Sequence, residues 1–150
     1  MEQIGFAIKS VKETEYFVNE SLELDDQIDY TLNAGLDIRT DANEINFIVF
    51  ASFRKKGTTE DYLRGKTIST FLFENLKSRA AIKDGKEVVD LPDPLWVTLF
   101  SISYSHARAM LAKSQAGTKY NHLILPIINP EEHFRKVFRN ELPDPAKLST

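Results

Sequence analysis

The stretch LPDPLWVTLFSISYSHARAMLAKSQAGTKYNHLILPIINPEEHFRKVFR, residues 91–139, decides the fold of this chain. Two prolines flank Asp93 near its start, which predicts a long helix with Asp93 as the N-cap and Pro94 at the first position. The helix is expected to end near Gln115, because a glycine that favours helix termination follows closely. An extended apolar crossover comes next. Asn129, followed by a proline and two acids, predicts a second, short helix.

Apolar side chains form two neighbouring stripes along the long helix, whereas an amphipathic surface helix has one. One side of such a helix can pack on a sheet of its own chain, and the other side needs a second layer. We therefore expect a partner subunit to supply that layer. The predicted subunit interface contains Leu95, Trp96, Leu99, Phe100, Ile102 and Tyr104.

The residues before this stretch show the alternation of apolar and polar side chains that is typical of antiparallel strands. The first strand alternates imperfectly, which indicates either one strand with a bulge near Ser10 or two short strands. Turn residues occupy positions 40–43, and a Lys-Asp-Gly turn signal follows at 83–85. The predicted strands span residues 6–18, 30–39, 44–54 and 66–77. The fold class is therefore α+β: a four-stranded antiparallel sheet, a long helix, an extended crossover and a short C-terminal helix.

Length and composition restrict the class of protein. The chain has 150 residues, of which 42% are hydrophobic and 27% charged, as expected of one globular domain over residues 1–150. The proline-containing tail at about 140–150 is expected to be flexible. The net charge of −3 argues against nucleic-acid binding. We expect a cytoplasmic protein, because the chain has no cysteine, no signal-peptide pattern and no apolar run of about 20 residues.

No group of residues has the pattern of an active site. The three histidines, His106, His122 and His133, do not have the spacing of a metal site. Ser103 lies three residues before His106, so a nucleophile and a base could meet, but no nucleophile-elbow motif accompanies them. We therefore expect no catalytic residue, no metal ion and no cofactor, and a function that depends on surfaces.

Several short pieces of the sequence resemble the SecB export chaperone family. They are an Ala-Arg pair at 107–108 in the long helix, a Gly-Thr pair at 117–118, and Pro-Ile-Ile-Asn at 126–129, where the family has Pro-Val-Asn. Phe-Leu-Phe-Glu at 71–74 is similar to the family's Phe-Leu-Cys-Glu strand. The order of the predicted elements also agrees with the family. This chain differs in having Ala109 where the family has an acid.

The resemblance implies a homo-oligomer, a dimer of dimers in which the long helices lie between two layers of sheet. It also implies a holding chaperone for protein export that binds unfolded or precursor polypeptides without ATP. In the family, a SecA-type motor binds an acidic surface of the sheet. Leu72 and Glu74 match positions in that surface.

The client-binding groove of such a chaperone must be apolar and adaptable. Burial of client side chains contributes roughly 25 cal/mol per Å², and pairing along an open strand edge adds affinity that does not depend on sequence. Core packing is the alternative role for each apolar side chain that could line the groove. The predicted groove residues are Ile48, Phe50, Tyr120, Leu123, Phe134 and Phe138.

Three other functions stay open at the level of sequence. One is a SecB-like adaptor dedicated to a single partner, such as a toxin–antitoxin pair. Another is a structural adaptor whose apolar patches bind one fixed protein. The third is a small enzyme or small-ligand-binding domain, which would need a closed pocket with convergent polar groups.

Overall fold

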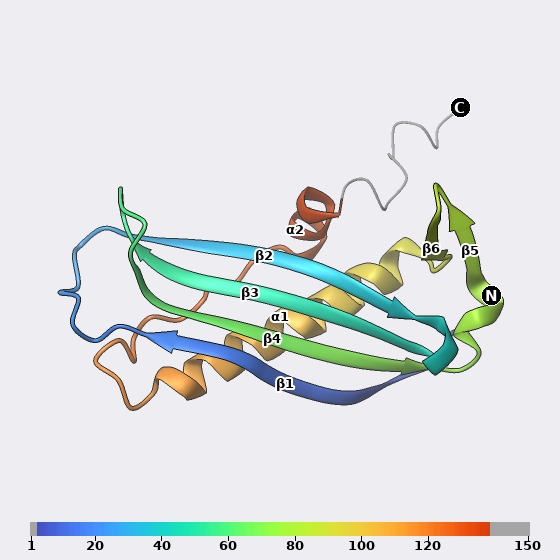
Figure 1. Ribbon diagram of the computed structural model, residues 1–150, viewed down its shortest axis with the longest axis horizontal. Coiled ribbons are helices and arrows are strands. Elements are labelled where there is room, and N and C mark those ends of the chain that lie inside the picture. Colours follow the sequence, from blue (N-terminus) through green and yellow to red (C-terminus); the bar gives the residue numbers. More distant parts are fainter. Residues whose placement is uncertain (1–2, 139–150) are drawn as a thin grey trace.

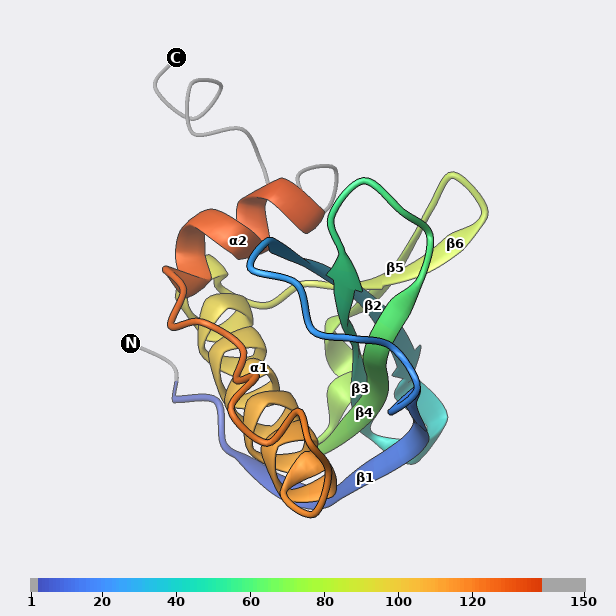
Figure 2. The same ribbon diagram turned by 90° about the vertical axis from the view of Figure 1, so that its left-hand side faces the viewer.

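The computed structural model describes residues 3–138 and has two layers, a long antiparallel sheet and a layer of helix and crossover on one of its faces (Figure 1). The sheet has the strand order β1-β4-β3-β2, and α1 covers one of its faces (Figure 2). This arrangement confirms the predicted α+β class. The elements are β1 (Phe6–Val18), β2 (Ile28–Arg39), β3 (Glu44–Lys55), β4 (Asp61–Phe73), β5 (Ala80–Lys83), β6 (Lys86–Val89), α1 (Asp93–Gln115) and α2 (Pro130–Val137). The predicted flexible tail lies outside the described residues.

The four strands of the main sheet follow the predicted pattern, with differences in register and bounds, and β5 and β6 add a two-stranded sheet around the turn predicted at 83–85. β1 is one strand whose register shifts between Ile8 and Ser10, where the bulge was predicted, and again between Glu13 and Glu15. The fourth strand was predicted at 66–77 but spans 61–73. It begins earlier because the β3–β4 connection is short, so pairing with β3 starts at once.

Turn chemistry determines where the strands end. Asn43, after the short 3-10 helix η1 (Thr40–Ala42), and Asn75, before η2 (Leu76–Arg79), adopt left-handed backbone with φ of 57° and 50°. Asn tolerates this conformation because its short polar side chain can bond locally. Asp84 and Gly85 join β5 to β6 with φ of 52° and 75°, the pattern of a two-residue hairpin turn.

Both helices form where the sequence predicts them. The predicted N-cap of α1 was wrong by one residue, because Pro92 occupies the cap position and Asp93 lies in the first turn, where its charge favours the positive end of the helix dipole. At α2, the Asn129 side chain accepts a hydrogen bond from the Glu132 amide at 3.2 Å, as an N-cap should.

Two clusters of buried side chains hold the layers together. One joins the first half of α1 to the sheet and to α2, and includes Phe47, Phe71, Phe100 and Phe134. The Phe100 and Phe134 rings are 5.8 Å apart. The other cluster joins the second half of α1 to the crossover. The second apolar stripe of α1, for which a partner subunit was expected, is therefore covered largely by this chain's own α2 and crossover.

Side chains of α1 hold the crossover in place through its backbone. Residues 123–129 form no strand or helix, so their carbonyl groups need other partners. Tyr104 donates its hydroxyl proton to the Pro126 carbonyl, and the Arg108 Nε–H donates to the Leu125 carbonyl at 2.7 Å. The Gln115 side-chain amide donates to the carbonyl of Leu123. Tyr104 and Arg108 are four residues apart and share one helix face.

The environment of Tyr104 extends the pH range in which its phenol stays neutral. Burial is the main cause that raises the pKa of Tyr104 to about 12, and the neighbouring phenol of Tyr30 adds to the rise, while the charge of Arg108 opposes it. Since only the neutral phenol can donate to Pro126, the hydrogen bond to the crossover persists above pH 10, where an ordinary tyrosine loses its proton.

Gly65 on β4 tests how tightly α1 packs on the sheet. A Cβ atom at Gly65 would lie 2.9 Å from Cδ1 of the buried Leu111. We expect Gly65→Ala to reduce the free energy of unfolding by about 1–3 kcal/mol through overpacking, measured by urea denaturation. Gly35→Ala on β2 is the control, since nothing lies within 4 Å of its added Cβ. Equal stability of the two variants would contradict the packing described above.

Tyr104→Phe tests the attachment of the crossover. Loss of the hydroxyl leaves the Pro126 carbonyl without this donor, so we expect a loss of about 1–3 kcal/mol in the free energy of unfolding. Tyr30→Phe, at a half-exposed position, should change it by less than about 0.5 kcal/mol.

The pH dependence of stability gives the Tyr104 prediction a second measurement. The folded state raises the pKa of Tyr104 from 10.0 to about 12, so it holds the proton more tightly than the unfolded chain does. This contribution to stability is complete below pH 10 and is lost as the pH rises toward 12. The stability difference between wild type and Tyr104→Phe should therefore shrink over that range. A constant difference would contradict the assignment.

Candidate functional site: the crossover surface

The crossover presents apolar side chains both to the core and to solvent. Leu123 and Leu125 are buried, whereas Ile124 and Ile127 are 50% and 86% exposed. The hydrogen bonds to α1 involve the carbonyl groups of Leu123, Leu125 and Pro126, so they hold the segment from which Ile127 projects. Ile127 is the most exposed large apolar side chain of the described chain. Such exposure beside other accessible apolar groups is typical of an interaction surface.

A hollow lies between the crossover and the outward side of α1. Its volume is about 180 Å³, and it is lined by Ser101, Tyr104, Ser105, Arg108, Ile127, Ile128 and Pro130. Arg108 uses Nε on the crossover, which leaves terminal N–H donors of the guanidinium for other acceptors. The Ser105 hydroxyl donates to the carbonyl of Ser101. The hollow therefore offers a bound molecule apolar contacts and one cationic side chain, Arg108.

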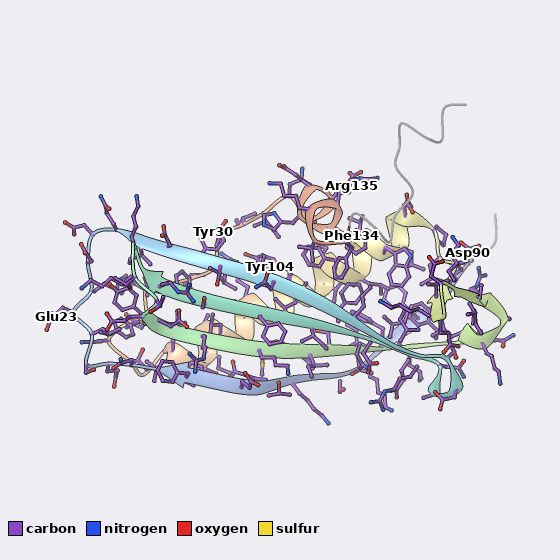
Figure 3. All side chains as sticks on the ribbon, turned by 45° about the horizontal axis from the view of Figure 1, so that its top comes forward. Glu23, Tyr30, Asp90, Tyr104, Phe134 and Arg135 are labelled. Atoms are coloured by element: carbon purple, nitrogen blue, oxygen red, sulfur yellow. The ribbon has the colours of Figure 1, made fainter. Side chains whose placement is uncertain are left out.

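The edge of the sheet adds a second kind of contact near this hollow. β2 pairs with β3 on one side, and no strand within residues 3–138 pairs with its other side. Tyr30 on β2 is 44% exposed and lies near enough to Tyr104 to raise the pKa of its phenol; Figure 3 shows the two side chains near each other. An extended peptide could thus pair with β2 and place side chains against the crossover. We call Tyr30, Arg108, Ile127 and Ile128 the crossover surface.

The six predicted groove residues do not come together in one place. Tyr120, Leu123, Phe134 and Phe138 are buried in the two core clusters. Ile48 and Phe50 lie on the opposite face of the sheet, away from α1, because they alternate with the buried Phe47 and Val49. Phe50 is 41% exposed. A role of these residues in client binding stays a prediction.

The six predicted interface residues of α1 differ in burial. Trp96, Leu99, Phe100 and Tyr104 are already buried within the chain, whereas Leu95 and Ile102 keep part of their surface. The two predicted residues of the motor-partner surface lie at the end of β4. Leu72, on the sheet face away from α1, is 42% exposed, and Glu74 is exposed just after the strand.

The histidine and serine on α1 do not form the hydrolytic pair weighed in the sequence analysis. The Ser103 hydroxyl donates to the Leu99 carbonyl at 2.8 Å. His106 instead bonds through Nδ1 to the Ser69 hydroxyl of β4 at 2.9 Å, and burial lowers the pKa of His106. Among residues 3–138, no group of three or more His, Asp or Glu side chains is placed to hold a metal ion.

Tyr30 and Ile127 were not among the predicted site residues. Tyr30 lies in the predicted strand 30–39, but its position on an edge strand depends on the strand order. Ile127 lies in an apolar run in which nothing local distinguishes an exposed residue from a buried one. A partial signal was present, since a crossover with more apolar residues than one core face can bury must expose some of them.

No protein-family model and no curated protein matches the sequence. Among solved structures, the chain is similar to the Mycobacterium tuberculosis Rv1957 SecB-like chaperone in complex with a ChAD peptide from the Rv1956 HigA1 antitoxin. The TM-score is 0.53 and the sequence identity 10%, over 82% of this chain and 90% of that chain. The likeness is therefore one of fold: the chain has a SecB-like arrangement of sheet, long helix and short C-terminal helix.

Proposed function

We propose that this protein is a cytoplasmic, ATP-independent holding chaperone that binds unfolded polypeptides at the crossover surface. The observation that carries the proposal is the 86% exposure of Ile127 on a segment that α1 holds by its backbone, next to an unpaired strand edge. Exposed apolar contact and main-chain pairing are the two interactions that any unfolded chain can offer. The solved structure of similar fold contains a bound antitoxin peptide, which supports a polypeptide as the partner.

The arrangement also suits many different clients. A client side chain can pack on Ile127, a client carbonyl or carboxylate can accept from Arg108, and the client backbone can pair with β2. None of these contacts needs a particular client sequence. The buried residues Tyr120, Leu123, Phe134 and Phe138 would reach a client only if the crossover or α2 moved away from α1. In the proposal they support the surface.

A dedicated adaptor is the second candidate function, and the antitoxin peptide in the similar structure favours it. An adaptor would bind one partner sequence and leave unrelated unfolded proteins free. Protein export through a SecA-type motor that contacts Leu72 and Glu74 is a further extension of the chaperone proposal. Pull-down with several denatured proteins separates a general chaperone from an adaptor.

Replacement of Ile127 tests the chaperone proposal. At molar excess, the wild-type protein should suppress the light scattering of a denatured client during refolding, without ATP. Ile127→Glu should lose most of that suppression, because a charge replaces the apolar contact. Ile82→Glu is the matched control, since Ile82 is 79% exposed on the β5–β6 hairpin, away from the crossover. Equal suppression by both variants, or no suppression by the wild type, would refute the proposal.

The proposed assembly is a dimer of dimers in which α1 of each subunit faces another subunit. Leu95 and Ile102, which keep accessible surface on α1, should contribute to it. Multi-angle light scattering at micromolar concentration should give four times the mass of one chain, which is 17.1 kDa. Leu95→Glu combined with Ile102→Glu should lower the measured mass without changing the circular dichroism spectrum. A wild-type protein of 17.1 kDa mass would exclude the assembly.

A further inference from the structure

The outer face of the sheet, the one away from α1, carries a second hollow built by all four strands. Its volume is about 190 Å³, and its polar lining includes Thr31 and Asn33 of β2, Ser52 and Arg54 of β3, and Arg64 of β4. Ser52 is a small residue between long neighbours, which creates the depression, and its hydroxyl is hydrogen-bonded to that of Thr31. The crossover surface described above takes no part in this site.

Two arginines are fixed in position around this hollow by one carboxylate. Asp61 accepts from the Arg54 Nε at 2.9 Å and from an Arg64 terminal nitrogen at 3.3 Å. The Asp61 side chain is only 10% exposed, whereas those of Arg54 and Arg64 are 38% and 54% exposed. The Asp61 carboxylate is thus largely covered. The two guanidinium groups face solvent and keep N–H donors for other acceptors.

Aromatic rings on the same face orient the cations further. The Arg64 guanidinium lies 4.3 Å from the ring centroid of Phe17, and the Lys66 amine lies 5.1 Å from that of Phe50, both within the range of cation–π contact. Glu15, which also lines the hollow, is 3.9 Å from Lys66 and is 64% exposed. Its charge is therefore offset by Lys66.

We propose that this hollow binds an acidic side chain of a partner polypeptide, held by Arg54 and Arg64. Arginine is the side chain best suited to bind a carboxylate through two parallel hydrogen bonds. The hydroxyl proton that the Thr31–Ser52 pair does not use internally and the side-chain amide of Asn33 can donate further hydrogen bonds. The volume is below the range of about 300–1,000 Å³ that is usual for whole small molecules. One anchoring side chain fits this volume better.

The surroundings of the hollow favour a peptide over an isolated acid. Phe50 is 41% exposed on its rim, and Ile48 and Ile68 form a cross-strand apolar pair next to it on the same face. A peptide that carries an acid beside an aromatic or aliphatic residue could place the acid in the hollow and the apolar residue against Phe50, Ile48 and Ile68. The proposed assembly, in which α1 faces other subunits, leaves this outer face accessible.

Fluorescence anisotropy with a labelled short peptide of alternating acidic residues and Phe tests the proposal. The full chain should bind this peptide saturably, and a peptide with Lys in place of each acid should bind at least about tenfold more weakly. Binding should weaken as the salt concentration rises to about 0.5 M. Arg54→Gln and Arg64→Gln should each reduce affinity about tenfold or more. Lys83→Gln, which makes the same charge change on the β5–β6 hairpin, should leave affinity unchanged.

Two further measurements separate peptide binding at this hollow from effects on folding and from the proposed chaperone function. Ile127→Glu should bind the acidic peptide as the wild type does, even where it fails to hold a denatured client. In the unaltered protein, addition of the peptide should shift the NMR amide signals of Thr31 and Ser52 more than those of the crossover. Lack of saturable binding, equal binding of the Lys peptide, or shifts confined to the crossover would overturn the proposal. Tighter binding of a polyuridylate at the same arginines would also overturn it, in favour of nucleic acid.

Discussion

The rest of this structure depends on the hydrogen bonds between α1 and the backbone of the crossover. An extended segment without a strand partner has carbonyl groups that lose water when they are covered, and this loss is costly unless donors replace the water. Tyr104, Arg108 and Gln115 supply those donors. They allow the crossover to lie against the helix without strand pairing, with Leu123 and Leu125 in the core. The same bonds keep Ile127 in solvent, so stability and the candidate surface have one cause.

The two faces of the sheet serve different purposes. The inner face is closely packed with aromatic rings from the sheet, α1 and α2, and Phe47 alone contacts four of them. The outer face has polar and charged rows with a few apolar side chains between them, and its cations are organised around Asp61. A thin sheet that is covered on one side must keep its other side in water or against a partner. The proposals for the crossover surface and for the outer hollow use the two sides of the molecule separately.

The fold of this chain is similar to that of a SecB-like chaperone solved with a bound peptide. At 10% identity the likeness concerns architecture, and the same architecture can carry different functions. The proposal of polypeptide binding uses local features of this chain: an edge of β2 that no strand within residues 3–138 pairs with, and the exposed side chains of Tyr30 and Ile127. The basic hollow on the outer face is a feature of this chain's own residues, since it depends on Arg54, Asp61 and Arg64.

The sequence by itself determined the elements of this protein. Alternation fixed which side chains of β3 are buried, from Ile45 to Phe53, because the period of a strand is a local property. Proline and Asn129 fixed the starts of the helices for the same reason. Only the tertiary structure decided what covers the second stripe of α1, since Phe134 and Phe138 reach it from α2 and sequence periodicity cannot tell a partner in the same chain from one in another. It also decided which crossover residues face solvent and that β2 is an edge, because both depend on contacts between segments far apart in the chain.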